Sequence, residues 1–252
     1  MTTFPIASRL FARGLREDVQ RLYLVFRTLD DLVDEGFADA EARVEAVERW
    51  CDGDGVLSDE TAILHDLARR YPLPRHALRD FCAGMRFDLE RGENRTEADL
   101  DTYCYRVAGT VGLTMTAMLG GSGPEAERRA IALGMAMQRT NVLRDIDEDQ
   151  AIGRVYLARQ TIDAYGGSIA PGERADLVRD QIRRADALYD EGIEGIRLLP
   201  RGRAAVAAAT VMYREILRQI EREGYGARAG RAVVRRRRKL WLIARSLPDH
   251  AG

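Results

Sequence analysis

Apolar residues recur every three or four positions along almost the whole chain of 252 residues. Such a spacing places apolar side chains on one face of an α-helix, whereas a half-buried strand would alternate apolar and polar residues. Alternating stretches are nearly absent, and no convincing β-hairpin is found. The pattern therefore predicts an all-α fold.

Breaks in this periodic pattern separate the expected helices. Most of them are rich in Gly and Pro, such as DGDG (52–55), GGSGP (120–124) and AYGGSIAPGE (164–173). The expected helices span about residues 17–35, 39–51, 59–70, 74–92, 97–120, 124–150, 172–198, 202–223 and 229–247. No repeat and no Pro- or Ser-rich linker divides the chain, so we expect one domain over residues 1–252.

Charge and cysteine usage exclude several classes of protein. The net charge is −1, so no global charge favours nucleic acid as a partner. Cys51, Cys82 and Cys104 lie far apart and form no CxxC motif. This spacing argues against a disulfide scaffold and against a thiolate zinc site, and it fits a reducing cytoplasm.

Membrane segments are not expected either. The N-terminal stretch MTTFPIASRLFARG lacks the pattern of a signal peptide, and the longest nearly apolar run (204–213) is too short to span a bilayer. We expect a cytoplasmic protein. The RRRRK run (235–239) leaves a peripheral contact with anionic membranes open, although such a run on a helix is more often a solvated face.

Two acidic clusters end otherwise apolar segments. They are DDLVDE (30–35) and NVLRDIDEDQ (141–150). At about 100° per residue, each cluster ends a narrow polar stripe with two carboxylates one helical turn apart. The first stripe consists of Tyr23, Arg27, Asp30 and Asp34, and the second of Gln138, Asn141, Asp145 and Asp149.

Paired carboxylates without nearby His or Cys suit Mg²⁺, which prefers oxygen ligands. Mg²⁺ ions bound there would in turn need an anion such as a diphosphate. Arg27, Arg144 and Arg154 lie beside the clusters and could clamp phosphate oxygens. The alternative interpretation is a pair of solvated acidic helix ends with ordinary salt bridges, which explains one cluster more readily than two.

Several motifs resemble the squalene/phytoene synthase family, in the family's order and from about residue 6 to residue 247. They are LYLVFRTLDDLVDE (22–35), GMRFDLE (84–90), YCYRVAGTVG (103–112), QRTNVLRDIDEDQAIGRVYLAR (138–159) and the closing helices (213–242). The resemblance implies the isoprenoid synthase helical bundle, with a central cavity closed by Mg²⁺ at one end. It also implies that two isoprenyl diphosphates are joined head to head.

The resemblance assigns roles to individual residues. It implies two or three Mg²⁺ ions held by Asp30, Asp34, Asn141, Asp145 and Asp149, with Asp31 and Glu148 behind them. The implied diphosphate ligands are Arg27, Arg144, Arg154 and Gln138. Tyr23, Tyr103, Tyr156 and Tyr213 match aromatic cavity positions, where ring faces would stabilise an allylic cation, with simple core packing as the alternative. The expected catalytic residues are Asp30, Asp34, Asp145, Asp149, Tyr103 and Tyr156.

The stretch YCYRVAGTVG also has a physical interpretation of its own. On a helix, Val107 shares a face with Tyr103, so we expect it to contact substrate. Gly109 and Gly112 weaken the helix and would let a long isoprenoid tail or a neighbouring helix approach the backbone. The two interpretations do not exclude each other.

Some departures from the family pattern leave the acceptor open. Glu93 and Asn94 stand where the family usually has Arg-Tyr, and Ala158 stands where it has Pro. The same ionisation site could therefore prenylate an aromatic acceptor or cyclise one diphosphate. Because both aspartate pairs are complete, a non-catalytic assembly protein is disfavoured. NADPH is not expected, since no strand–GxGxxG–helix unit is found.

Overall fold

The computed structural model of the protein describes residues 7–246, and within this range no residue lies in a β-strand. The all-α prediction is confirmed. The helices are α2 (Arg13–Asp34), α3 (Ala40–Asp52), α4 (Asp59–Ala68), α5 (Arg75–Leu89), α6 (Glu97–Cys104), α7 (Thr110–Met118), α8 (Pro124–Arg144), α9 (Ile146–Ala151), α10 (Arg159–Ala164), α11 (Ala175–Ile193), α12 (Arg203–Arg222) and α13 (Arg236–Ser246). Short 3₁₀ segments are η1 (Ser8–Leu10) and η3 (Glu194–Leu198), and η2 (Tyr105–Gly109) is a π-helical turn.

Local sequence explains where several of these helices begin and end. Ser58 and Thr96 precede α4 and α6, and each side chain accepts a hydrogen bond from the backbone N–H three residues on, in a capping box. Pro124 opens α8, where its missing N–H is not needed. Gly53 ends α3 with a φ of 111°, a left-handed conformation that favours glycine.

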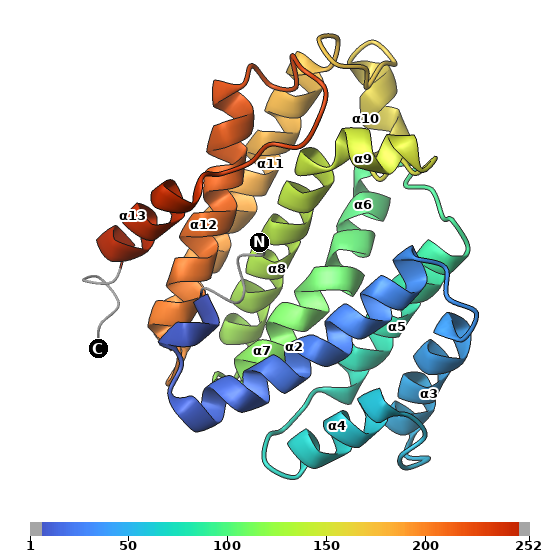
Figure 1. Cartoon of the computed structure of the whole chain (residues 1–252), viewed down its shortest axis with the longest axis vertical. Coiled ribbons are helices and arrows are strands. Elements are labelled where there is room, and N and C mark those ends of the chain that lie inside the picture. The colour runs from blue at the N-terminus through green and yellow to red at the C-terminus, as the bar shows by residue number, and fades with distance from the viewer. Residues whose placement is uncertain (1–6, 247–252) are drawn as a thin grey trace.

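Helix α8 lies in the middle of the bundle, between α6–α7 on one side and α11–α12 on the other (Figure 1). Helix α2 packs against α3, α4 and α5, and α13 packs on the outside of α12. Two glycines, Gly134 on α8 and Gly112 on α7, allow α8 to pack closely against η2 and α7. A Cβ on Gly134 would lie 2.3 Å from the oxygen of Ala108, and one on Gly112 would lie 2.4 Å from the oxygen of Ala130. The packing interpretation of Gly112 is confirmed, and this residue also borders the central cavity.

The apolar core has two main parts. One is built around α2, α3, α4 and α5 and includes Leu22 and Trp50, and the other is built around α8, α11 and α12 and includes Leu177 and Tyr189. A cavity of about 330 Å³ is lined by residues from both parts. The predicted central cavity is therefore present.

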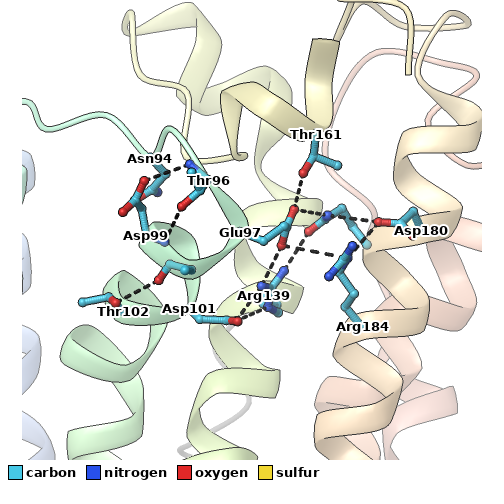
Figure 2. A network of polar contacts seen from close by, with 12 residues as sticks. Asn94, Thr96, Glu97, Asp99, Asp101, Thr102, Arg139, Thr161, Asp180 and Arg184 are labelled. Atoms are coloured by element: carbon cyan, nitrogen blue, oxygen red, sulfur yellow. Dashed lines mark hydrogen bonds and ion pairs between the residues drawn. The ribbon is translucent and has the colours of Figure 1, made fainter. Parts of the chain in front are cut away.

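A buried ionic network fixes α8 against its neighbours (Figure 2). The side chain of Arg139 is only 3% exposed and pairs with Glu97 and Asp101 of α6 at 2.9 and 2.6 Å. It also donates to Gln181 of α11 at 2.8 Å, and Thr161 of α10 donates to Glu97 at 2.6 Å. Such a buried cation is tolerated because each of its partners is in place.

Some predicted boundaries are wrong. The single helix expected over 124–150 is interrupted at Asp145, whose φ of −105° and ψ of 10° end α8 before α9 begins. Of the helix expected over 229–247, only α13 is helical, and residues 229–235 form a loop. Helix α10 was not predicted, because it is short and lies at the edge of a segment rich in glycine.

None of the helices in the described part of the chain combines the length and the apolar composition that a membrane-spanning segment needs. Cys51, Cys82 and Cys104 are buried and form no disulfide, as their spacing predicted. Burial raises the pKa of the Cys51 thiol to about 11, so little reactive thiolate is present near neutral pH.

Candidate functional site

The lining of the cavity is mostly apolar, with a few polar side chains from α2, α8 and α12. Predicted site residues in this lining are Tyr23, Arg27, Asp30, Tyr103, Val107, Gln138, Asn141 and Tyr213. The remaining predicted residues do not line it; they are Asp34, Arg144, Asp145, Asp149, Arg154 and Tyr156. These lie at the ends of α2 and α8, on α9 and in the segment that follows α9.

The first acidic cluster ends α2. One face of this helix is buried through residues such as Leu22 and Leu29, and at about 100° per residue the polar stripe lies on the flank of that face. Arg27 donates to Asp30 at 3.1 Å and pairs with Asp31 at 2.5 Å. Burial, followed by the neighbouring charge of Asp34, raises the pKa of Asp30 to about 7. The nearby arginine therefore does not fully compensate this carboxylate.

The second acidic cluster spans the junction of α8 and α9. Asp145 accepts from Arg144 at 2.8 Å and pairs with Arg231 of the α12–α13 loop at 3.0 Å. Arg231 also pairs with Glu148 at 3.4 Å. Burial, followed by the charge of Asp145, raises the pKa of Asp149 to about 7. The second cluster thus resembles the first in holding one poorly compensated carboxylate.

Helices α2 and α8 both run towards the side of the molecule where α9 lies (Figure 1), and side-chain interactions connect the two clusters there. Arg154, 120 residues after Asp34 in the chain, pairs with its carboxylate at 3.4 Å. The charge of Asp34 also contributes to the raised pKa of Asp149. The fold therefore brings together the two stripes that the sequence predicted separately.

The donors at this end fit Mg²⁺. Within residues 7–246, no three His, Cys, Asp or Glu side chains lie close enough together to form a metal site by themselves. The available donors are carboxylates and one amide oxygen. The Oδ1 atom of Asn141 is buried and accepts no hydrogen bond, while its Nδ2 donates to Gln138 at 3.1 Å. An unpaired amide oxygen beside desolvated carboxylates is an environment that a hard cation with an oxygen preference would satisfy.

Tyr103 and Tyr156 form an aromatic pair beside the cavity. Their ring centroids lie 5.0 Å apart in a stacked arrangement. Both hydroxyls donate to Asp88 of α5, Tyr103 at 3.1 Å and Tyr156 at 3.0 Å. Arg154 in turn donates to the hydroxyl of Tyr156 at 2.7 Å. Only Tyr103 of this pair lines the cavity.

Asp88 and Arg231 were not predicted as site residues. Asp88 belongs to GMRFDLE (84–90), a stretch noted for its resemblance, but it lies 15 and 68 residues from the tyrosines that it contacts. Arg231 lies in the loop that was expected to be helical. No local periodicity signals such long-range contacts, so only the fold reveals them.

The chain is similar in sequence to known squalene and phytoene synthases. Residues 1–238 match the family profile of squalene/phytoene synthase. The chain is 38% identical over 257 residues to a phytoene synthase of Thermus thermophilus, covering 98% of this chain and 86% of that protein. It is 35% identical over 265 residues to the 15-cis-phytoene synthase of Synechococcus elongatus, covering 94% and 85%.

The similar solved structures are also synthases of this kind. A crystal structure of a dehydrosqualene synthase in complex with ligand has a TM-score of 0.88 and 25% identity, and the match covers 98% of this chain and 91% of that one. The squalene synthase HpnC from Alicyclobacillus acidocaldarius has a TM-score of 0.80 and 27% identity, covering 88% and 89%.

Proposed function

The chain belongs to the squalene/phytoene synthase family of head-to-head prenyltransferases, and we propose that it joins two molecules of geranylgeranyl diphosphate into a phytoene-type hydrocarbon. The choice of this substrate is supported by the curated relatives, which are phytoene synthases at 38% and 35% identity. The squalene-type structures are less similar in sequence, at 25% and 27% identity.

The observation that carries the proposal is a mostly apolar cavity whose lining includes Asp30 of the first acidic cluster and Asn141 of the second. An isoprenoid tail gains about 25 cal/mol for each Å² of apolar surface that it buries in such a cavity. A diphosphate cannot lie among carboxylates without cations between them. The geometry therefore fits a molecule with an apolar tail and an anionic head.

The family is typically Mg²⁺-dependent, and this chain has residues that fit the ion. Asp30 and Asp34 of α2, with Asn141, Asp145 and Asp149 of the second cluster, would hold the ions. When bound, Mg²⁺ neutralises the diphosphate and stabilises the charge that develops on it as it leaves.

The arginines around the clusters would bind the diphosphate oxygens. Arg27 lines the cavity, and Arg144 and Arg154 lie at its acidic end, each with a planar group that can donate two parallel hydrogen bonds. Arg231 joins this set through its contact with Asp145. Gln138 also lines the cavity beside Asn141 and would orient the head group.

Aromatic side chains would stabilise the allylic cation that forms when diphosphate leaves. Tyr23, Tyr103 and Tyr213 line the cavity, and the face of an aromatic ring attracts a cation. Apolar neighbours such as Val107 would exclude water that could otherwise capture the cation. No reduction step is part of this proposal, so NADPH is not required.

The proposal is tested by identifying the products. Purified protein with Mg²⁺ is given farnesyl or geranylgeranyl diphosphate, with and without NADPH, and the products are analysed by mass spectrometry. We expect a phytoene-type hydrocarbon from geranylgeranyl diphosphate, independent of NADPH. Prenyl alcohols or cyclic terpenes as the only products would refute head-to-head coupling and indicate an aromatic acceptor or a cyclisation.

Matched variants test the proposed metal ligands. Asp30→Ala and Asp145→Ala should abolish coupling while the circular dichroism spectrum stays helical. Asp39→Ala, at an exposed carboxylate just before α3, is the control and should keep wild-type activity. Near-normal turnover of both site variants would contradict the assignment.

A further inference from the structure

A buried carboxylate lies directly behind one wall of the cavity. Asp88 is 5% exposed and is not part of the lining, whereas Tyr103, which it contacts, is. Tyr103 donates to Oδ2 of Asp88 at 3.1 Å, and Tyr156 donates to Oδ1 at 3.0 Å. Tyr103 therefore separates a negative charge from the space where the substrate would react.

This arrangement fixes the direction of the Tyr103 hydroxyl. A phenol has one proton to donate, and an ionised carboxylate can only accept. Because the Tyr103 hydroxyl donates its hydrogen bond to Asp88, the lone pairs of the Tyr103 oxygen point away from Asp88. These lone pairs form the negative end of the O–H dipole. The stacked ring of Tyr156 and the ring of Phe87, 5.3 Å away, hold the Tyr103 ring in place.

We propose that Asp88 is a positioning residue for the coupling reaction, which turns the Tyr103 hydroxyl proton away from the cavity so that the oxygen and the charge behind it stabilise the allylic cation. This inference rests on the function proposed above. Fixed dipoles and charges that face a developing charge in a site without water are among the largest contributions to catalysis. Here the developing charge is positive, so the fixed groups must be negative.

The charged groups around Asp88 do not fully neutralise its carboxylate. Arg154 is the cation that faces it, at 3.3 Å from Oδ1, and the same guanidinium is shared with Asp34 at 3.4 Å. One cation therefore serves two carboxylates. Burial raises the pKa of Asp88 to about 6, so the carboxyl is mostly ionised above neutral pH.

The variant Asp88→Asn tests the inference without changing the size of the side chain. Its amide would donate to one phenol oxygen and force that hydroxyl proton to turn away from residue 88. We expect kcat to fall on the order of 10- to 100-fold, less than for a group that touches the reacting atoms. We expect KM to stay within about threefold, because substrate binding is not what the residue provides. The share of prenyl alcohol in the product should rise.

A double-mutant cycle separates this role from a purely structural one. In a Tyr103→Phe background, Asp88→Asn should lower kcat by clearly less than it does in the wild type, since no hydroxyl remains to be oriented and only the direct effect of the Asp88 charge is lost. The full loss in that background would overturn the inference and mean that Asp88 acts through Arg154 or the fold. Wild-type kcat in Asp88→Asn alone would overturn it as well.

A second comparison does not depend on how well the Asp88 variant folds. Tyr156→Phe keeps the contact between Asp88 and Tyr103, and Tyr156 does not line the cavity. It should therefore cost less in kcat than Tyr103→Phe, and an equal cost would contradict the inference. If the wild-type protein couples no diphosphate at all, the proposed function fails instead.

Discussion

Replacing Asp149 by Asn should stabilise the protein in the absence of metal while weakening its function. No ion pair is seen for this carboxylate among the described residues, and burial beside Asp145 raises its pKa from 3.8 to about 7. That difference corresponds to at most about 4 kcal/mol. Because the side chain is partly exposed and shares its repulsion with neighbours, we expect about 1–2 kcal/mol, or a rise in Tm of about 2 to 6 °C.

The sign of the pH dependence follows from the direction of the shift. The folded-state pKa of Asp149 lies above its unfolded value, so its contribution to stability is fully present below pH 4 and is lost as the pH rises towards 7. The advantage of Asp149→Asn should thus be largest at pH 8 and shrink as the pH falls. Melting curves without metal, recorded from pH 8 to pH 5, measure this difference. Adding Mg²⁺ and inorganic diphosphate should raise the Tm of the wild type more than that of the variant.

Asp147, two residues earlier on α9, provides a matched control, because its replacement by Asn should lower the stability of the protein instead of raising it. Its carboxylate accepts from the buried Arg174 at 2.6 and 2.8 Å and from the backbone of Gly230 at 2.7 Å, and the hydrogen bonds from Arg174 lower its pKa. Asp147→Asn should destabilise the protein by about 2–4 kcal/mol at neutral pH, an effect lost as the pH falls through the lowered pKa. A lower Tm for Asp149→Asn than for wild type at pH 8 would refute the reasoning.

Three further predictions concern packing, the loop arginine and the buried network. Gly134→Ala places a Cβ 2.3 Å from a backbone oxygen and should cost about 1 to 3 kcal/mol in urea unfolding, whereas Gly14→Ala, with nothing within 4 Å, should be neutral or slightly stabilising. Arg231→Met should raise KM roughly tenfold in steady-state kinetics with a smaller effect on kcat, if Arg231, which pairs with Asp145, binds the diphosphate as we propose. Arg139→Met leaves Glu97 without its buried cation and should cost about 3–5 kcal/mol in thermal unfolding.

The parts of the fold that sequence predicted are those that local patterns determine. Helices such as α2 and α12 carry a continuous apolar face, so their periodicity alone locates them. The segment 229–235 was expected to be helical, but tertiary contacts hold it as a loop. The N–H of Gly230 binds Asp147, and Ala232 and Val234 are buried in the core beside α11 and α12. No local signal records these contacts.

In the candidate site, too, sequence predicted the features that depend on local helical geometry and missed those that depend on contacts between distant segments. The stripes on α2 and α8 follow from helical geometry, and both occur in the structure, although the break at Asp145 places Asp149 on a separate helix. Contacts between distant segments, such as Arg154 with Asp34 or Asp88 with Tyr103, depend on how the helices pack. The sequence could indicate which residues have the required chemistry, but not which of them touch.

The arginines around the acidic clusters explain why so many carboxylates are tolerated at one end of an apolar bundle. Arg154 reaches Asp34 from the segment after α9, and Arg231 reaches Asp145 from the loop after α12, so part of the positive charge comes from distant parts of the chain. These pairs are partly exposed, and such pairs contribute little to stability. Asp30 and Asp149 retain pKa values near 7 despite them. The protein's own cations thus do not fully stabilise the ionised form of these two carboxyl groups. Since uncompensated carboxylates destabilise the fold, their presence here favours a role in binding external cations together with an anionic substrate.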